Sequence, residues 1–337
     1  MADAANSMQA VVIARPGGPE VLEIREVPRP APGSAEVLVR VRASALNRAD
    51  VLQRQGRYPA PPGAPADIPG LEFAGEVAEL GPNAGRWRPS QRVFGLTAGG
   101  GHAQYVVAHE QTLAEIPANL SWIQAAAIPE AFITAQDALA QAGMRPGEAV
   151  LIHAVGSGVG LAAVQLVRAL GAVPYGTSRT ADKITRSQGF GLADGIALPA
   201  GLEDLPEAVR RWTAGKGVDV VVDLVGGPYL AASLAVMAAR GRLVALTTSG
   251  GAKVEIEMKY LLGRRLTVIG SALRGRSLEE KIQVTERFAA QVVPLLAQGK
   301  VLPVLDSEFP IRQIQDAHRR MESNASFGKI ALRMESD

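Results

Sequence analysis

Short apolar runs that alternate with polar residues dominate the first third of the chain. Glycines and prolines separate these runs, a pattern typical of strands joined by turns. Strands are predicted at 9–15, 22–27, 36–45, 72–80, 91–96 and 103–108. A short helix is predicted at 47–55, and the proline-rich stretch 59–69 predicts an irregular loop. These elements indicate a β-rich, barrel-like first domain.

The pattern changes near Trp122, after which β-branched runs alternate with helical periodicity as far as about Leu302. The runs predict strands at 149–154, 172–177, 195–198, 218–224, 242–247 and 266–270. Helices are predicted between them, such as 161–170, 205–212 and 229–239. This alternation favours an α/β fold with a doubly wound parallel sheet. In the tail, an extended 307–310, a helix at 314–323 and a strand at 329–333 are expected to return to the first domain.

The segment 155–160, which reads VGSGVG, joins the strand at 149–154 to the helix at 161–170. In such a unit, glycines let the backbone approach a pyrophosphate, and the first N–H groups of the helix point at the anion. With Gly160 as the last glycine of G-x-G-x-x-G, Val155 and Ser157 replace the other two glycines. A tight loop without a ligand is therefore the alternative. The strand that begins at 172 favours the binding unit, because it completes a βαβ arrangement.

The end of the second strand in this unit indicates which dinucleotide is bound. A carboxylate there would favour NAD, but the chain has Ser178 and Arg179, with Lys183 one turn later. Because guanidinium and ammonium groups bind a 2′-phosphate, we predict NADP(H). The alternative is an exposed basic loop, and Asp182 could pair with Arg179.

Composition narrows the function classes. The chain has 337 residues, of which 47% are hydrophobic, 20% charged and 4% aromatic, with a formal net charge of +2. The small charge excess and the few aromatic residues argue against nucleic acid as a partner. No apolar run is long enough to span a membrane and no signal segment opens the chain, so a cytoplasmic location is expected. Residues 1–7 are expected to form a disordered extension.

Several long strings resemble one family in the right order: ASALNRADVLQRQGRY (43–58), PGLEFAGEV (69–77), AAAIPEAFITA (125–135), HAVGSGVGLAAVQL (153–166), SALRGR (271–276), LPVLDSEFPIRQIQDAHRRME (302–322) and GKIAL (328–332). They are similar to zinc-independent quinone oxidoreductases of the medium-chain dehydrogenase/reductase superfamily. Ser157 and the IPEAFITA string resemble the stress-inducible branch most, with zeta-crystallin more distant.

The resemblance implies a GroES-like β-barrel catalytic domain at 8–125 and 303–337, and a Rossmann NADP(H)-binding domain at 126–302. It implies hydride transfer from NADPH to a quinone, and a homodimer or homotetramer. The branch tolerates serine at 157 in the phosphate turn. The residues implied to hold the cofactor in this turn are Gly156, Ser157, Gly158, Val159 and Gly160.

A zinc site is not expected. Zinc enzymes of the superfamily have Gly-His-Glu where this chain has Gly70-Leu71-Glu72. Leucine cannot coordinate a metal, and the chain has no cysteine to complete a site. The four histidines do not have ligand-like spacing and are expected to be structural or exposed: His102, His109, His153 and His318.

The candidate catalytic residues lie in the segment 47–58. Asn47 could hydrogen-bond the ribose or the substrate oxygen, Asp50 could hold Asn47 or the loop, and Tyr58 could donate to the oxygen that gains charge. Alternatively, Asn47 only caps the helix and Tyr58 only packs against the proline loop. Leu52 stands where zeta-crystallin-like members have a second tyrosine, so a mechanism that needs that tyrosine cannot operate here.

The resemblance implies further cofactor contacts outside the glycine turn. Thr134 matches a threonine beside the nicotinamide, although it could instead bond its own helix. Val225 and Leu273 match positions whose backbone contacts ribose and carboxamide. Thr247 stands at the end of the fifth strand, where the branch usually has glycine, and Leu198 replaces a tyrosine that touches the 2′-phosphate in many members. Glu130, at a helix start, is a less convincing acid, because carboxylates there often serve the helix dipole.

Three functions remain open from the sequence. The first is an NADPH-dependent quinone reductase, in which the cofactor supplies the hydride and the protein orients it. The second is a reductase of activated double bonds such as enones or enals, which needs the same pocket. The third is a nucleotide-binding sensor or stress protein without turnover.

Overall fold

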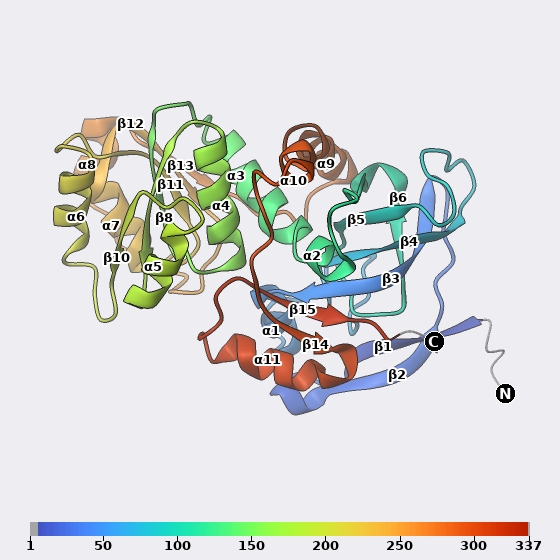
Figure 1. Ribbon diagram of the computed structural model, residues 1–337. Helices are drawn as coiled ribbons and strands as arrows, with labels where there is room; N and C mark the ends of the chain where they lie inside the picture. Colours follow the sequence, from blue (N-terminus) through green and yellow to red (C-terminus); the bar gives the residue numbers. More distant parts are fainter. Residues whose placement is uncertain (1–5, 336–337) are drawn as a thin grey trace. The chain divides into compact units, whose positions relative to one another are not determined.

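The computed structural model describes residues 6–335. Contacts divide the chain into two compact units: one made of the segments up to Ile133 and from Leu273 onward, and one spanning Thr134–Ala272 (Figure 1).

The first unit is built on antiparallel β structure. Its strands are β1 (Ser7–Ile13), β2 (Leu22–Pro28), β3 (Glu36–Leu46), β4 (Glu72–Leu80), β5 (Arg92–Leu96), β6 (Tyr105–His109), β7 (Leu113–Glu115), β14 (Leu305–Pro310) and β15 (Lys329–Arg333). One sheet runs β14-β15-β3-β4-β5-β7, with β6 also on β3, and β1 pairs with β2. The tail strand β15 lies antiparallel to β3, so the predicted return of the tail is confirmed.

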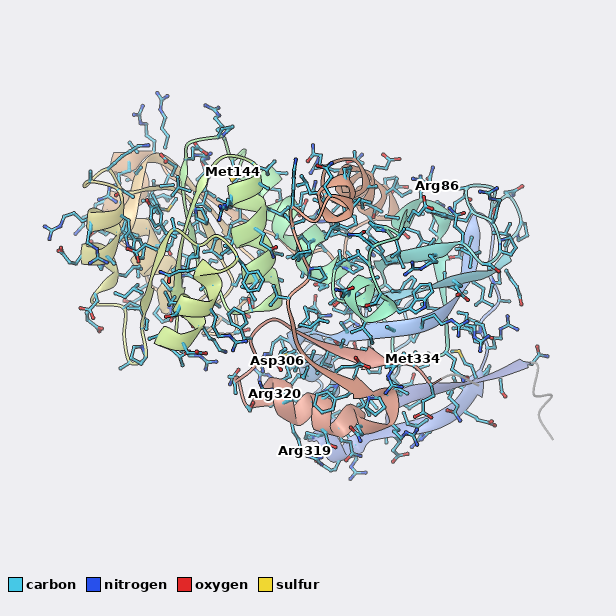
Figure 2. All side chains as sticks on the ribbon, in the orientation of Figure 1. Arg86, Met144, Asp306, Arg319, Arg320 and Met334 are labelled. Atoms are coloured by element: carbon cyan, nitrogen blue, oxygen red, sulfur yellow. The ribbon has the colours of Figure 1, made fainter. Side chains whose placement is uncertain are left out.

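Several helices accompany this sheet in the first unit. They are the 3-10 turns η2 (Pro19–Val21), η3 (Glu110–Thr112) and η5 (Ile311–Gln313), the π-helix η4 (Pro129–Ile133), and the α-helices α1 (Arg48–Arg54), α2 (Trp122–Ala126), α9 (Leu278–Gln291), α10 (Val293–Ala297) and α11 (Ile314–Glu322). The inward residues of β3, including Val37 and Val39, pack with Phe73 in a buried core. Arg320 of α11 forms an ion pair with buried Asp306 at 2.8 Å, which ties the helix to β14 (Figure 2).

The second unit confirms the predicted doubly wound parallel sheet. Its strands run in the order β10-β9-β8-β11-β12-β13, all parallel. They are β8 (Ala149–Ile152), β9 (Val173–Ser178), β10 (Asp194–Ala197), β11 (Val218–Asp223), β12 (Met237–Ala245) and β13 (Thr267–Gly270). The helices are α3 (Thr134–Gln141), α4 (Gly158–Ala169), α5 (Ala181–Gln188), α6 (Leu205–Trp212), α7 (Pro228–Val236) and α8 (Met258–Arg264).

The strand order reverses between β8 and β11. From β8 the chain steps outward through β9 to β10, then returns to β11 and steps the other way to β13. Right-handed crossovers in opposite directions place their helices on opposite faces of the sheet. The crevice at the carboxyl ends of the strands, where the order reverses, is the ligand site of such sheets.

The unit boundaries differ from the expected 126 and 302. The second unit begins at Thr134 and ends at Ala272, so α9 and α10 belong to the first unit. Helix α9 buries Phe288, whose ring packs edge-on against Phe94 of β5 with centroids 5.7 Å apart. The apolar face of α9 is therefore covered by the barrel sheet, which a helical pattern alone does not reveal.

The amino terminus also differs from the expectation. Of the predicted extension at 1–7, residues 1–5 lie outside the described residues, but Ser7 already begins β1. Ser7 pairs with Pro28 at the end of β2. Within residues 6–335, no helix is long and apolar enough to cross a bilayer.

Candidate functional site

The glycine turn of the second unit forms the start of α4. Ser157 is the N-cap, and its hydroxyl accepts a hydrogen bond from the N–H of Gly160 at 3.0 Å. Serine is a preferred N-cap because its oxygen satisfies one of the free N–H groups of the first turn. Ser157 thus has a local structural purpose in this turn, and the first N–H groups of α4 lie at the carboxyl end of β8.

Two glycines of this turn allow close approach. A Cβ on Gly160 would lie 2.4 Å from the carbonyl oxygen of Ala154, so only glycine lets α4 start this close to β8. A Cβ on Gly156 would lie 2.8 Å from Cδ of Lys183. The Lys183 side chain therefore lies against the turn.

The residues predicted to select NADP(H) gather at the end of β9. Ser178 is buried and ends the strand, and Arg179 follows with an exposed side chain. Asp182 lies 3.6 Å from Arg186, one turn along α5. Asp182 was expected to be able to pair with Arg179, but its ion pair in the structure is with Arg186.

The turn after β11 lies beside the loop after β12. Buried Asp223 accepts from the N–H groups of Val225 and Gly226 at 2.9 and 2.8 Å, so the Val225 N–H serves this turn. A Cβ on Gly226 would lie 2.4 Å from the carbonyl oxygen of Thr247. The Thr247 hydroxyl bonds to that of Ser249 at 2.7 Å. Val225 and Thr247 are thus held together at the carboxyl edge of the sheet.

Thr134 stands at the first turn of α3 with a buried hydroxyl. Within residues 6–335, this hydroxyl has no hydrogen-bond partner. Buried polar groups are rarely left unpaired, so a ligand is a natural partner. Leu198, in contrast, is part of the apolar core of the second unit. Leu273 begins the second segment of the first unit, and its carbonyl accepts from the N–H of Arg276 at 3.2 Å.

The first unit brings Asn47 and Asp50 into a buried charged cluster. Asp50 accepts from the N–H of Asn47 at 2.8 Å and from that of Gly70 at 2.9 Å. Asn47 donates to Glu72 at 2.9 Å and accepts from Lys329 at 2.5 Å. The Lys329 ammonium and the Glu72 carboxylate form an ion pair at 2.6 Å with almost no solvent exposure.

Burial dominates the electrostatics of this cluster. It raises the pKa of the Asp50 carboxyl to about 6, although the two backbone N–H donors oppose the rise. It lowers the pKa of His102 to about 3, so this ring is neutral. Nδ1 of His102 lies 2.9 Å from the Ser44 hydroxyl, which itself donates to the Glu72 carbonyl. His102 is therefore a neutral structural residue, as expected.

Tyr58 lies against Arg274. The guanidinium lies 5.0 Å from the centre of the Tyr58 ring and donates to the Tyr58 carbonyl at 3.3 Å. Arg274 is buried and also donates to Gln53 at 2.6 Å. Burial raises the pKa of the Tyr58 hydroxyl above its usual 10, with Arg274 opposing the rise. Tyr58 thus stays protonated at neutral pH and can donate a hydrogen bond.

Glu130 lies in the π-helix η4, a type of distortion frequent at functional sites. Its N–H donates to the second carboxylate oxygen of Glu72 at 2.8 Å. Burial, and then the neighbouring Glu72, raise the pKa of the Glu130 carboxyl to about 7. From the sequence, Glu130 was a less convincing acid, but in the structure it lies in the cluster.

The other histidines have structural partners. His153 lies 2.9 Å from the Thr177 hydroxyl and 2.8 Å from the Ser233 hydroxyl. His318 bonds to Arg54 at 3.1 Å, and His109 caps η3 by accepting from the N–H of Gln111. Among residues 6–335, no group of three or more His, Asp or Glu side chains is arranged to hold a metal ion.

Comparison with known proteins identifies the family. Residues 33–118 match the family described as alcohol dehydrogenase GroES-like domain, and residues 202–332 match that described as zinc-binding dehydrogenase. A quinone oxidoreductase of Pseudomonas aeruginosa is 32% identical over 94% of this chain and 96% of its own. The chain belongs to the medium-chain dehydrogenase/reductase superfamily.

Two solved structures resemble this chain over nearly its whole length. A quinone oxidoreductase of Pseudomonas syringae has a TM-score of 0.86 at 29% identity and covers 97% of this chain and 99% of that one. CurK enoyl reductase has a TM-score of 0.84 at 28% identity, and the match covers 98% of this chain and 100% of that one. The chain is therefore an oxidoreductase of a superfamily that uses a nicotinamide cofactor.

The second unit fits such a cofactor. The glycine turn leaves room only for backbone at the start of α4, and Thr134 offers an unpaired buried hydroxyl. Both observations match the dinucleotide site of the superfamily's doubly wound sheet.

Three residues of the first unit's cluster were not predicted as site residues from the sequence: Glu72, Arg274 and Lys329. Each is buried, although each stands in or beside an otherwise apolar segment. Buried charges are rare and need partners. A charged residue inside a predicted apolar strand, such as Lys329 in KIAL, is the signal that could have revealed them.

Proposed function

We propose that this protein is a zinc-independent, NADPH-dependent quinone oxidoreductase. The observation that supports it most is the half-buried Tyr58 against the Arg274 guanidinium, beside a buried charged cluster with a lysine cation and no metal ligand set among the described residues. The names of the relatives agree, since the proteins of Pseudomonas aeruginosa and Pseudomonas syringae are called quinone oxidoreductases. Ser157 and the IPEAFITA string favour the stress-inducible branch.

The second unit would hold the cofactor. The N–H groups at 158–160 are suited to the pyrophosphate, and the Thr134 hydroxyl to the nicotinamide end. Ser178, exposed Arg179 and Lys183 would receive the 2′-phosphate, since no carboxylate ends β9. The bound cofactor would supply the hydride.

The first unit would bind and orient the acceptor. The protonated Tyr58 hydroxyl would donate a hydrogen bond to the oxygen that gains charge, and Arg274 would stabilise that charge. Asn47 and Asp50 would act as positioning residues, because their polar atoms hold the start of α1 to Glu72 and Gly70. Burial raises the pKa of the Glu72 carboxyl, and the Lys329 ammonium opposes this rise through its ion pair with Glu72.

Steady-state kinetics with matched acceptors test this function. The protein should oxidise NADPH with a naphthoquinone or an ortho-quinone much faster than with a 2-alkenal. Oxidation of the alkenal alone would assign the protein to the second candidate. Tight NADPH binding without turnover of any acceptor would instead support a sensor.

The second candidate is an NADPH-dependent reductase of activated double bonds in enones or enals. The likeness to CurK enoyl reductase over the whole chain favours it. The same tyrosine and arginine could stabilise the enolate oxygen that forms when a hydride adds to a conjugated carbon.

A homodimer or homotetramer is part of the proposal. One edge of the parallel sheet is β13, which pairs only with β12 in the second unit. Exposed Val268 on this strand makes it suitable for contact with a second copy of the chain.

A further inference from the structure

Three carboxyl groups in the first unit share two cations. Glu72 pairs with Lys329, and Arg274 acts on both Asp50 and Glu130. His102 is neutral because it is buried, so it adds no charge. If all three carboxyls were ionised, one negative charge would be left uncompensated in a water-poor environment, which is costly. One of the three therefore keeps its proton near neutral pH.

Hydrogen bonding distinguishes the three carboxyls. Glu72 accepts from Lys329, Asn47 and the Glu130 N–H, and Asp50 accepts from two backbone N–H groups. Within residues 6–335, no donor contacts the Glu130 carboxyl. Donors stabilise the ionised form of a carboxyl, so the proton belongs on Glu130. Burial raises the pKa of all three carboxyls, to about 7 for Glu130 and about 6 for Asp50. For Glu72, the Lys329 ammonium and the donors from Asn47 and the Glu130 N–H oppose the rise.

The elements packed against η4 carry other charged side chains, but the cations that act on the pKa of the Glu130 carboxyl are Lys329 and Arg274. Helix α9 brings Lys281, whose pKa is lowered by burial and by Arg274. Strand β5 brings Arg92, which donates to the Leu120 carbonyl and lies over the Trp122 ring. On β4, Glu76 is paired with Arg42 at 2.9 Å.

Accessibility separates Glu130 from the other two carboxyls. Asp50 and Glu72 are 0% exposed and cannot reach a substrate. Glu130 and Tyr58 are half-buried, and the Glu130 charge acts on the Tyr58 hydroxyl. The protonated carboxyl is therefore also the one that a substrate and water can reach.

We propose that Glu130 is the catalytic acid that protonates the reduced acceptor, an inference that rests on the proposed function. A hydride from the reduced nicotinamide dinucleotide adds two electrons and one proton to the quinone and leaves a hydroquinone monoanion. The O–H bond of Glu130 breaks, and a new O–H bond forms on the anionic oxygen. Glu130 remains as a carboxylate and takes a proton from water before the next turnover.

Acid strength favours this direction of transfer. A group with a pKa of about 7 is a stronger acid than a phenol, whose pKa is about 10. Tyr58 is unsuited to the same task, because burial raises its pKa further. Tyr58 donates a hydrogen bond to the oxygen, while Glu130 gives up the proton.

The test compares Glu130→Gln, Glu130→Asp and Tyr58→Phe, with Glu286→Gln on the exposed face of α9 as the control. Wild-type kcat/KM for a naphthoquinone should fall as pH rises through about 7, because Glu130 loses its proton. Glu130→Gln should be about 100-fold slower and lose this pH dependence. Glu130→Asp should restore part of the rate and a pH-dependent limb. Tyr58→Phe should be slower but keep the limb.

A second readout does not depend on turnover. Infrared difference spectra of wild type should show a carboxylic acid band that disappears near pH 7 and is missing in Glu130→Gln. A band from Asp50, whose pKa is about 6, should be present in both proteins. A flat wild-type pH profile, or an unchanged limb in a folded Glu130→Gln, would overturn the proposal while leaving quinone reduction in place. Wild type that titrates in the infrared but reduces no acceptor would refute the proposed function and the acid role, while the proton would still belong to Glu130.

Discussion

Arg179 is the residue on which the cofactor preference depends most. Its side chain is exposed at the end of β9, and its neighbour Asp182 is engaged by Arg186. We predict that Arg179→Ala weakens NADPH binding about 10- to 100-fold, because charge-assisted hydrogen bonds to a 2′-phosphate are lost. NADH, which lacks this phosphate, should bind with nearly unchanged affinity. Isothermal titration calorimetry with both nucleotides measures the difference.

Arg186→Ala provides the matched control. It removes the same charge seven residues later in the chain, from a side chain of α5 that contacts Asp182. NADPH affinity should change little. If Arg179→Ala weakened NADPH and NADH equally, the residue would serve the fold or the pyrophosphate rather than the 2′-phosphate.

The role of a single residue could be predicted from the sequence where its partners are its neighbours along the chain. Ser178, Arg179 and Lys183 are neighbours along the chain, so the basic strand end was visible in the sequence. The ion pair of Glu72 with Lys329 joins residues far apart in the chain, because β15 returns to β3 beside β4. That contact, and with it the proton on Glu130, depends on the folded topology.

At the scale of elements, the close approach of β8 and α4 predicts that a side chain at Gly160 weakens both the fold and nucleotide binding. Gly160→Ala adds a Cβ that would lie 2.4 Å from the Ala154 carbonyl oxygen and 2.8 Å from the Val155 Cα. Since both neighbours are backbone, the helix start must shift. We expect a loss of about 1–3 kcal/mol in the free energy of unfolding and weaker binding of both NADPH and NADH.

Urea denaturation and nucleotide titration measure these two effects. Gly147→Ala is a useful comparison for the added methyl group, because a Cβ there would have no neighbour within 4 Å. Gly147 has φ of +81°, so some backbone strain is expected, but nucleotide affinity should not change. Normal stability and affinity in Gly160→Ala would reject the phosphate-turn assignment.

His153, which directly follows β8, connects strand β9 and helix α7 of the second unit. Its titration makes the stability of the protein depend on pH. Its ring bonds to Thr177 of β9 and Ser233 of α7, and burial lowers its pKa to about 4. The unfolded chain takes up this proton near pH 6.5, but the folded protein does not until about pH 4. Stability is therefore fully present above pH 6.5 and is lost as pH falls toward 4.

Between pH 7 and pH 5, His153 should contribute about 2 kcal/mol to this loss. His153→Gln keeps a polar group but cannot take up a proton. We expect the variant to be less stable at pH 7, with a smaller decrease on acidification than wild type. Urea midpoints at the two pH values measure both effects, and an equal decrease in wild type and variant would contradict the assignment.

The bounds of a helix or strand could be predicted where the alternation or periodicity of its own apolar residues defines it. The strand at 72–80 and the helix at 205–212 have the predicted bounds, because alternation or helical periodicity sets them directly. The domain assignment of α9 was not predictable in this way. Its amphipathic pattern requires a partner surface, but does not say whether the parallel sheet or the barrel supplies it.

At the scale of the whole molecule, the edge strand β13 gives the chain a surface for self-association. Only one side of β13 is paired, with β12, so its other edge leaves backbone N–H and C=O groups available. Exposed apolar side chains accompany it in the second unit: Val254, Ile256, Met258, Leu262 and Val268, with exposed fractions from 38% to 69%. A monomer would leave this apolar surface in water, which favours burial against a second copy.

We therefore expect a mass of at least twice 35.3 kDa for wild type in multi-angle light scattering. Val268→Lys should shift the mass toward one chain, because a lysine on a strand edge opposes edge-to-edge pairing. Leu170→Lys is the matched control, since Leu170 and Val268 are both 42% exposed but Leu170 lies at the end of α4. A single-chain mass for wild type would refute the dimer, and equal dissociation by both variants would show that added charge, rather than the β13 edge, breaks the assembly.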